Sequence, residues 1–415
     1  MKIMIIHPGT QHSTKLAAAL KKNGHDVKLV TTVYNKKNSF INKISRLLPI
    51  AERKRLISRM NLELNDSDIL LMSELSGLFL LLLNRIDKSK KIYVKYKYRV
   101  AKKVGIKAAK LALKDNYDLV IAFDSYAYYP FNYLNKEKSS IIKVIDYSAA
   151  YAPAAKETYM KVILKYPILI DTMKKDRCVL WDDKYYDSLC KEAFLTDFIT
   201  CASEYTKGTL VKYGVESSKI YVVPYGYNPS NSGKTNKLIS NDTFNILFVG
   251  GVNVMKGIAY LIDALKQIEE ENISLTLVGN VQDVIKDMAL KDKRIIIKGY
   301  ISHNDIHVEY ENANLFIFPS LSDGFGFAPL EAMSYGVPCV VTNTSGISDI
   351  IEDGIDGFIV ESESVKVLAE KIRWGYNNKE SLHKMGVLAK DKVSKYSVEN
   401  YAKRTQNFIE RIYNE

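Results

Sequence analysis

The sequence predicts an α/β protein with two Rossmann-like, doubly wound domains that face each other. Short apolar runs alternate with helical patterns along the chain, and this alternation is typical of parallel sheets covered by helices. The chain has 415 residues, of which 47% are hydrophobic, which is enough to bury two domain cores rather than one. A polar stretch near the middle separates the two sets of elements.

The first half contains strand-like runs and one clearly bounded helix. The helix is predicted over residues 14–23, because Gly24 follows and glycine commonly ends helices. The strands are expected at residues 2–6, 26–31, 119–123, 141–145 and 220–223.

The polar stretch 228–236 is rich in turn-forming residues and lacks apolar periodicity, so it is interpreted as a linker. We therefore expect one domain over residues 1–227, a second over 228–395, and a terminal helix over 396–415. In the second domain, strands are predicted at 244–249, 274–278, 294–298 and 315–318, with helices starting at Gly257, Val281 and Pro329.

Composition narrows the class of partner. The net charge is +12 and the pI is near 9.1, which favours an anionic partner such as nucleotide phosphates, an acidic membrane or nucleic acid. The four cysteines show no C-x-x-C pair, so we expect reduced thiols in a cytoplasmic protein and no structural zinc. The longest apolar run, residues 78–83, is far shorter than the roughly 20 residues of a membrane span.

Two carboxylates stand eight positions apart around a glycine turn. Asp323 precedes Gly324 and Gly326, and Glu331 follows Pro329 in the first turns of a predicted helix. Unpaired N–H groups at such a helix start favour a phosphate, and glycines let the ligand approach closely. One acid is placed to meet a sugar and the other a ribose. The competing interpretation is an ordinary turn aspartate and a glutamate favoured by the helix dipole.

Two further strand-to-helix loops carry glycines. One follows the first strand at residues 7–13, and the other follows the first strand of the second domain at residues 250–257. Neither is a G-x-G-x-x-G fingerprint or a G-x-x-x-x-G-K-[ST] phosphate loop, which argues against a dehydrogenase or a P-loop enzyme. In open parallel sheets such loops bind ligands beyond the carboxyl ends of the strands.

The order and spacing of several motifs resemble the retaining glycosyltransferases of family 4, which are similar to group 1 glycosyltransferases. This resemblance covers nearly the whole chain and implies the GT-B fold, in which the last helix crosses back to the first domain. The motifs that carry it are residues 219–226, 248–250, 256–257, 277–279, 299–300, 319–336, 352–354 and 357–358.

The resemblance also implies roles for single residues. Glu331 matches the acid that holds the ribose, Asp323 the acid that contacts the donor sugar, and Lys256 the lysine that neutralises the leaving diphosphate. Backbone groups complete the expected donor site, at Gly9 in the first domain and at Phe325, Gly326 and Phe327 in the second.

The chain departs from the family pattern at three positions. Aspartate stands at Asp323 where glutamate is usual, and Gly251 replaces an arginine that would clamp a phosphate. Asn253 or a residue of the first domain is a candidate to compensate. Asp124 stands where the family has a histidine, so it is a candidate to orient an acceptor hydroxyl or accept its proton, against a turn aspartate paired with Ser125 or Tyr126.

Two other residues follow strands of the first domain. His12 lies in a loop expected to face the cleft and is a candidate catalytic residue, with a solvated loop histidine as the alternative. Asp146 is similarly placed after its strand.

Basic residues concentrate in two parts of the first domain, residues 41–64 and 85–110, and the second is interleaved with tyrosines. Such stretches favour binding to an anionic membrane surface, and the alternative is a solvated face of a lysine-rich chain.

We therefore expect a retaining hexosyltransferase that uses a nucleotide sugar, with a UDP-sugar favoured and no metal cofactor. It would act on a glycan or lipid-linked acceptor at the cytoplasmic membrane face, in the synthesis of cell-surface polysaccharide. The alternatives are a non-catalytic nucleotide-sugar-binding or partner-stabilising protein and, less favoured, a sugar-nucleotide epimerase. Nucleic acid is not expected as a partner, because no recognised nucleic-acid module is present.

Overall fold

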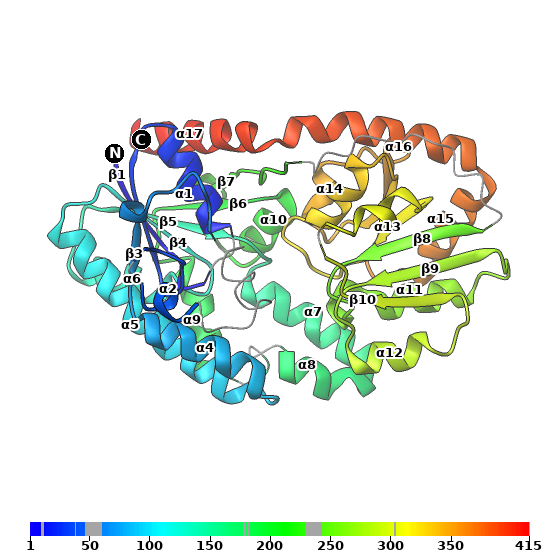
Figure 1. Ribbon diagram of the computed structural model, residues 1–415, viewed down its shortest axis with the longest axis horizontal. Helices are drawn as coiled ribbons and strands as arrows, with labels where there is room; N and C mark the ends of the chain where they lie inside the picture. Colours follow the sequence, from blue (N-terminus) through cyan, green and yellow to red (C-terminus); the bar gives the residue numbers. More distant parts are fainter. Residues whose placement is uncertain are drawn as a thin grey trace.

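The structure of the chain is a computed structural model that describes residues 1–9, 12–37, 39–45, 60–176, 180, 182–228, 243–302 and 304–414. It contains two parallel sheets, each packed between helices, that lie side by side along the long axis of the molecule (Figure 1).

The first sheet has seven strands in the order β3-β2-β1-β4-β5-β6-β7, and all its pairs are parallel. The chain reverses its direction of winding between β1 and β4, which pair with each other at the centre. The strands are β1 (Lys2–Ile6), β2 (Asp26–Thr31), β3 (Ile69–Leu71), β4 (Leu119–Phe123), β5 (Ile142–Tyr147), β6 (Phe198–Cys201) and β7 (Ile220–Val222). The helices are α1 (Ser13–Lys22), α2 (Phe40–Ser45), α4 (Glu74–Ile86), α5 (Lys91–Lys114), α6 (Tyr128–Lys136), α7 (Ala152–Lys165), α8 (Ile170–Asp176), α9 (Asp183–Glu192) and α10 (Glu204–Lys212).

The second sheet has six parallel strands in the order β10-β9-β8-β11-β12-β13. Its winding reverses between β8 and β11, so the loops that follow these two strands diverge and leave room for a ligand. The strands are β8 (Phe244–Val249), β9 (Ile273–Val278), β10 (Ile295–Gly299), β11 (Leu315–Phe318), β12 (Cys339–Thr342) and β13 (Gly357–Val360). The helices are α11 (Ile258–Lys266), α12 (Asp283–Ala289), α13 (His307–Glu311), α14 (Phe327–Ser334), α15 (Val365–Asn377) and α16 (Lys379–Val393).

These elements confirm the predicted α/β class and its two doubly wound sheets. Four short strands that sequence patterns did not predict, β3, β6, β12 and β13, have only three or four residues each. The helix expected from Val281 begins instead at Asp283, because Val281 forms a bridge with Val252 in the neighbouring loop.

The last helix, α17 (Val398–Asn414), leaves the second domain and packs against α1 of the first, as expected (Figure 1). After β7 the chain packs closely against the start of α17 at Gly226, where an added Cβ would lie 2.7 Å from the Cα of Val398. The backbone N–H of Tyr227 donates to the carbonyl of Tyr396 over 2.8 Å. The predicted domain boundary at residue 228 stays a prediction, because most of the polar linker lies outside the described residues.

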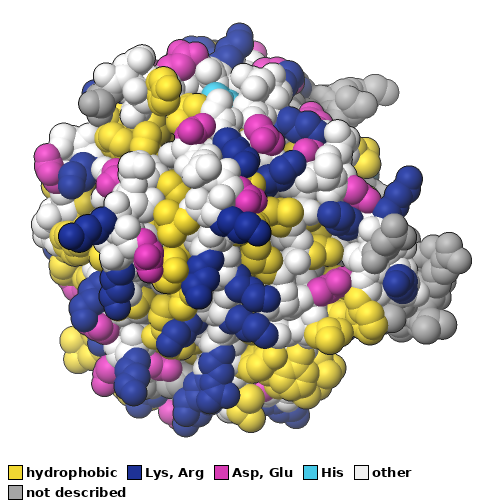
Figure 2. All heavy atoms as spheres, turned by 90° about the vertical axis from the view of Figure 1, so that its left-hand side faces the viewer, with side chains coloured by type: hydrophobic (Ala, Val, Ile, Leu, Met, Phe, Trp, Pro, Cys, Tyr) yellow, Lys and Arg dark blue, Asp and Glu magenta, His cyan; other side chains and the backbone are white. Residues whose placement is uncertain are grey.

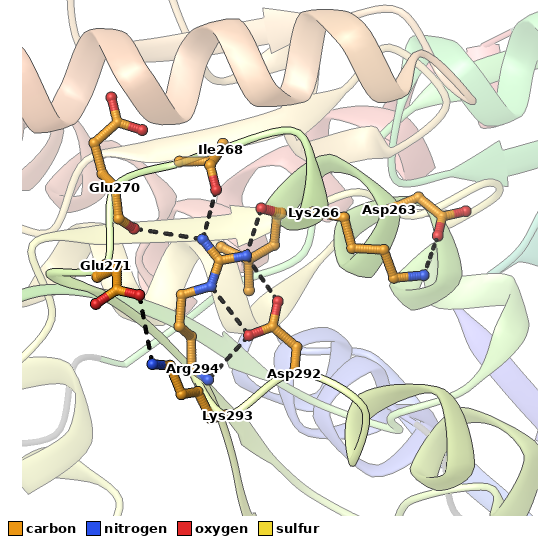
Figure 3. A network of polar contacts seen from close by, with 9 residues as sticks. Asp263, Lys266, Ile268, Glu270, Glu271, Asp292, Lys293 and Arg294 are labelled. Carbon is orange, nitrogen blue, oxygen red and sulfur yellow. Dashed lines mark hydrogen bonds and ion pairs between the residues drawn. The ribbon is translucent and has the colours of Figure 1, made fainter.

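A single arginine ties together the edge of the second sheet (Figure 3). The guanidinium of Arg294 donates to both carboxylate oxygens of Asp292, over 3.0 and 2.7 Å, and to the carbonyls of Leu265 and Ile268 over 2.8 and 2.7 Å. Arg294 thus adds side-chain hydrogen bonds to the carbonyls of Leu265 and Ile268, in the last turn of α11 and just after it. This network fixes α11, and therefore the loop that precedes it, against the sheet.

Candidate active site

A pocket of about 340 Å³ lies at the carboxyl ends of β8 and β9. Its two walls approach closely because both loops turn on glycines. Gly279 has φ +133°, and an added Cβ there would lie 1.8 Å from the carbonyl oxygen of Gly250, so no other residue fits. The lining consists of Val249, Gly250, Gly251, Val278, Gly279, Asn280, Tyr300, Ile301, Ile306 and Glu331. Its glycines and its one carboxylate suit a sugar or nucleoside with hydroxyl groups.

Glu331 extends from α14 into the wall of this pocket. Its Oε2 accepts a hydrogen bond from the hydroxyl of Tyr310 over 3.1 Å. Tyr310 is itself fully buried and stacks on Tyr335 with ring centroids 5.3 Å apart. Burial, followed by the neighbouring Glu331 carboxylate, raises the pKa of Tyr310 far above its ordinary value. Tyr310 therefore stays a hydrogen-bond donor and fixes the orientation of the glutamate.

Lys256 lies at the end of a short 3-10 turn (Val254–Lys256) that follows β8. The side chain of Asn253 caps this turn by accepting a hydrogen bond from the backbone N–H of Lys256 over 3.0 Å. Gly257, with φ +71°, then lets the turn pack against Pro319, whose carbonyl oxygen would be 1.8 Å from an added Cβ. The turn and the loop after β11 are thereby held together.

Lys256 and Asp323 form an ion pair through Nζ and Oδ2. The ammonium also lies 4.8 Å from the ring centroid of Phe318, and the other carboxylate oxygen of Asp323 accepts the backbone N–H of Phe325 over 3.1 Å. Asp323 and Lys256 are 18% and 25% exposed, so a ligand at this point could reach both. The structure thus brings together two residues that are 67 positions apart in the sequence.

The glycine turn after Asp323 contacts the first domain. An added Cβ at Gly324 would lie 2.1 Å from the carbonyl oxygen of Ser148, at the end of β5. The hydroxyl of Ser203, at the start of α10, donates to the carbonyl of Gly324 over 2.8 Å. The hydroxyl of Tyr205 donates to that of Ser322 over 2.9 Å. The two domains therefore meet at the predicted donor loop.

Asp124 contacts Ser148, the residue of the first domain that Gly324 approaches. Its Oδ1 accepts both the N–H and the hydroxyl of Ser148, over 2.9 and 2.7 Å, so its partner is Ser148 rather than Ser125 or Tyr126. Burial raises the pKa of Asp124. A carboxylate with a raised pKa beside the donor loop is chemically suited to accept a proton.

Asp146 is buried, and its Oδ1 accepts the hydroxyl of Tyr225 over 2.9 Å. Burial raises its pKa to about 7, with the hydrogen bond from Tyr225 opposing that shift and the charge of Asp124 adding to it. Asp146 thus holds the hydroxyl of Tyr225, whose ring contacts Phe327 of the second domain.

The ring of His12 packs between Tyr225 and Phe123, with centroids 3.8 and 5.6 Å away. Burial, followed by the charges of His7 and Lys15, lowers the pKa of His12 to about 3, so the ring is neutral. Its Nε2 has no hydrogen-bond partner among the residues that the structure describes. Tyr225 in turn stacks on Phe327 at 6.0 Å, which places His12 one ring behind the donor loop.

The predicted backbone sites divide between two places. Gly251 lines the pocket with Glu331, and Gly326, with φ +92°, precedes α14 next to Phe325 and Phe327. Gly9 instead lines a second pocket, between α4 and α5 of the first domain, which we call the α4–α5 pocket. Its N–H donates to Nδ1 of His7 over 2.9 Å.

Several residues of the site had no signal in the sequence. Ser148, Ser203 and Tyr310 act through contacts between distant segments, and no local motif marks them. Lys15 on α1 places its ammonium 5.4 Å from the ring centroid of Phe327 and so brings a positive charge of the first domain to the donor loop. Tyr225 is different, because it lies just before Gly226 within the family-like motif at residues 219–226, which marks it in the sequence.

No group of three or more His, Cys, Asp or Glu side chains able to hold a metal ion occurs in the described parts of the chain. The metal-independent reaction stays a prediction. Within those same residues, no helix combines the length and the apolar character needed to cross a membrane.

Comparison with known proteins finds relatives chiefly for the second half of the chain. Residues 233–392 match the family described as glycosyl transferases group 1. A 41.2 kDa protein in the cps region of Klebsiella pneumoniae is 24% identical over 253 residues, which are 59% of this chain and 63% of that protein. The UDP-Gal:alpha-D-GlcNAc-diphosphoundecaprenol alpha-1,3-galactosyltransferase of Escherichia coli is 31% identical over 171 residues, 36% of this chain and 43% of that protein. The chain thus spans less than two thirds of the length of these two relatives.

Solved structures extend the likeness to the whole fold. HepE of Anabaena, crystallised with UDP, superimposes on this chain with a TM-score of 0.65 at 14% identity. The superposition covers 100% of each of the two chains. This similarity shows the GT-B fold, as the sequence resemblance implied. Over residues 233–392, the chain is similar to the glycosyl transferases of group 1.

Proposed function

We propose that the protein is a retaining glycosyltransferase that moves a hexose from a nucleotide sugar, with a UDP-sugar favoured, to a lipid-linked or glycan acceptor. The observation that carries the proposal is the placement of Lys256 and Glu331. The loop after β8 contributes both to the pocket that contains Glu331 and, through Lys256, to the ion pair with Asp323 in the loop after β11. A nucleoside in the pocket would therefore have its diphosphate near an ammonium.

Each residue has a physical role in this proposal. Glu331, oriented by Tyr310, accepts hydrogen bonds from ribose hydroxyls. Lys256 stabilises the negative charge that develops on the leaving diphosphate, and the start of α14 adds backbone N–H groups of the same polarity. Asp323 turns from its ion pair toward the hydroxyls of the sugar.

Because Gly251 lacks the guanidinium of the family, a second cation must come from elsewhere. Lys15 fits this need, since its ammonium already faces Phe327 from the first domain. Asn253 is engaged as the cap of the turn at Lys256, so we assign it a supporting role.

For the transfer step we propose front-face attack. The acceptor hydroxyl approaches the anomeric carbon on the side from which the diphosphate leaves, the new glycosidic bond forms as the old one breaks, and the proton passes to a diphosphate oxygen. Asp124 orients the acceptor hydroxyl through its position behind Ser148. Neutral His12 contributes an apolar wall with a nitrogen able to accept a hydrogen bond.

Two observations bear on the acceptor and on where the reaction takes place. The name of the E. coli relative gives it a diphosphoundecaprenol acceptor. The part of the first domain at residues 85–110 is strongly basic, which supports action at an anionic membrane face. The basic stretch at residues 41–64 lies mostly outside the described residues.

The test is a panel of UDP-, GDP- and ADP-sugars in a thermal-shift experiment, followed by release of nucleoside diphosphate in the presence of membrane extract. A ligand that binds only the folded state raises its apparent stability. We expect the largest shift with a UDP-sugar, and loss of turnover in Asp323→Ala and Glu331→Ala. Undiminished transfer by either variant would contradict the assignment of the site.

One specific observation favours a second candidate, a nucleotide-sugar-binding protein without turnover. Lys256 and Asp323 already neutralise each other, and the arginine clamp is missing at Gly251. This candidate predicts tight UDP binding without transfer to any acceptor. An epimerase would instead convert the donor sugar with no acceptor present.

A further inference from the structure

The α4–α5 pocket has a volume of about 220 Å³ and lies apart from the pocket of Glu331. The close approach of α4 to the first sheet forms its floor, because an added Cβ at Gly77 would lie 2.4 Å from Oγ1 of Thr32. Gly9 and Tyr126 lie on the side toward β1 and β4, and Tyr93 and Lys97 come from α5. The pocket therefore connects the helical hairpin with the strand ends that carry Asp124.

The hairpin of α4 and α5 that encloses the pocket is strongly basic. Lys97 lines it, with its ammonium 5.1 Å from the ring centroid of Tyr126. Between Glu74 and Lys114 the chain carries twelve basic side chains and only two acids. Both acids are engaged in local structure, since Glu74 accepts the N–H of Ile41 over 2.8 Å and Asp87 accepts that of Tyr93 over 2.8 Å. The hairpin therefore carries ten more basic than acidic side chains, which favours an anionic ligand.

The outer face of α4 is apolar and exposed to solvent. Leu75, Phe79, Leu82 and Ile86 are 65%, 44%, 50% and 61% exposed, and their spacing of three and four residues places them in one row. Ile92 at the start of α5 is 62% exposed. Figure 2 shows Lys and Arg side chains spread over this end of the molecule, with a hydrophobic patch at the bottom. An apolar row bordered by cations matches the boundary between hydrocarbon and anionic head groups of a membrane.

We propose that the α4–α5 hairpin binds a lipid phosphate at a membrane surface. The α4–α5 pocket takes the phosphate of the lipid beside Lys97, and the apolar row of α4 lies in the hydrocarbon. The proposal rests on the proposed glycosyltransferase function, because a lipid phosphate held near Gly9 and Tyr126 would present its attached sugar toward Asp124.

Two other occupants fit the hairpin less well. A second copy of the chain, packed on the same row by a two-fold axis, would bring two sets of unbalanced cations together. Single-stranded nucleic acid needs exposed rings for stacking, whereas Tyr96 packs against Phe79 at 5.0 Å and Tyr98 against Tyr129 at 5.2 Å.

The test measures co-sedimentation of the full chain with three kinds of vesicle. These are phosphatidylcholine alone, phosphatidylcholine with phosphatidic acid, and phosphatidylcholine with phosphatidylserine at matched surface charge. We expect binding to both anionic vesicles and a preference for phosphatidic acid, whose phosphomonoester fits the pocket. Lys97→Gln should lower the affinity for phosphatidic acid vesicles about fivefold and so abolish that preference. Lys107→Gln, on the same helix but outside the pocket lining, should weaken binding to both anionic vesicles alike.

Further arms separate the lipid from free phosphate and the apolar row from the charge. Inorganic phosphate should compete only partly, because it lacks the hydrocarbon. Leu82→Ser combined with Ile86→Ser should lower vesicle binding at least about tenfold, whereas Leu290→Ser, which is 68% exposed in the second domain, should not. Equal effects of Lys97→Gln and Lys107→Gln, or full competition by inorganic phosphate, would overturn the lipid-phosphate site.

The outcome is separable from that of the proposed function. UDP-sugar binding measured by thermal shift should be the same in Lys97→Gln and the wild type. If UDP-sugars bind and the vesicle preference is absent, the lipid-phosphate site is wrong and the donor site stands. If the vesicle preference is present and no nucleotide sugar binds, the proposed function is wrong.

Discussion

The ammonium of Lys256 pairs with the carboxylate of Asp323, across two loops that follow neighbouring strands of the second sheet. A lysine that serves a departing diphosphate cannot remain fully neutralised by an aspartate. In the proposed reaction, donor binding redirects Asp323 toward the sugar and releases Lys256 toward the phosphates. The ion pair would then hold both side chains in position before the donor binds.

Removal of the lysine charge tests this role. Lys256→Met should lower kcat/KM for transfer by about 10²–10³-fold, since the developing charge on the diphosphate loses its fixed counter-charge. Lys266→Met is the matched control, because Lys266 pairs with Asp263 on the same domain. Steady-state release of UDP measures both. Equal activity of the two variants would show that the Lys256 pair is purely structural.

A second prediction concerns Gly251, where the family arginine is missing and a cation of the first domain would replace it. If Lys15 supplies the missing cation, Lys15→Met should weaken UDP binding about tenfold, and the added substitution Gly251→Arg should restore it. Gly251 permits this test because an added Cβ meets only Nδ2 of Asn253, at 2.9 Å, the end of a side chain. Titration calorimetry measures the affinities, with Gly251→Ala as the control for the Cβ alone. If Lys15→Met binds UDP like the wild type, Lys15 is not the compensating cation.

Contact between the domains depends on Gly324. Because an added Cβ would lie 2.1 Å from a backbone oxygen of Ser148, Gly324→Ala should force the domains apart and lower the stability by at least about 2 kcal/mol. Small-angle scattering should show a larger radius of gyration, and the thermal midpoint should fall. Gly208→Ala is the control, since an added Cβ on this helical glycine meets nothing within 4 Å and should stabilise the protein slightly. An unchanged radius in Gly324→Ala would contradict the contact.

Much of this arrangement was predictable because local patterns determine it. The strands at 2–6, 119–123 and 244–249 were predicted with correct bounds, since buried parallel strands are continuous apolar runs that end in loops. The closeness of the loops that carry Lys256 and Asp323 follows from the same logic, as both follow strands next to the winding reversal, whereas their ion pair was not predicted.

The remaining features could not be predicted because they depend on packing between distant segments. The burial that makes His12 neutral comes from Tyr225 and Phe123, and the partner of Asp124 is Ser148, which follows the neighbouring strand β5, rather than an adjacent residue. Gly9 was expected to meet the donor, and the structure places it in the wall of the α4–α5 pocket. The sequence of the loop that contains Gly9 does not determine toward which side of the strand end this loop turns.

Burial of Asp146 predicts a pH dependence of stability. Its pKa is raised to about 7 in the folded protein, against about 3.9 when unfolded, so between these values the folded state holds a proton that the unfolded state lacks. Stability should therefore fall as pH rises from about 4 to about 7, by up to about 4 kcal/mol from this group. Asp146→Asn mimics the protonated form and should remove this fall, making the variant more stable than the wild type at pH 8.

Urea unfolding at several pH values measures this effect. The control is Asp391→Asn, an exposed position on α16, which should follow the wild type. A stability difference between Asp146→Asn and the wild type that does not change between pH 5 and pH 8 would show that Asp146 is ionised throughout.

The most direct test of the donor site is calorimetric titration of UDP into the wild type, Glu331→Gln and the exposed control Glu311→Gln. The proposed site predicts that UDP binds the wild type and Glu311→Gln equally. Binding to Glu331→Gln should be at least about tenfold weaker, because the ribose hydroxyls lose a charged acceptor. Equal affinity for all three proteins, or no binding to the wild type, would contradict the assignment of this pocket to the donor nucleotide.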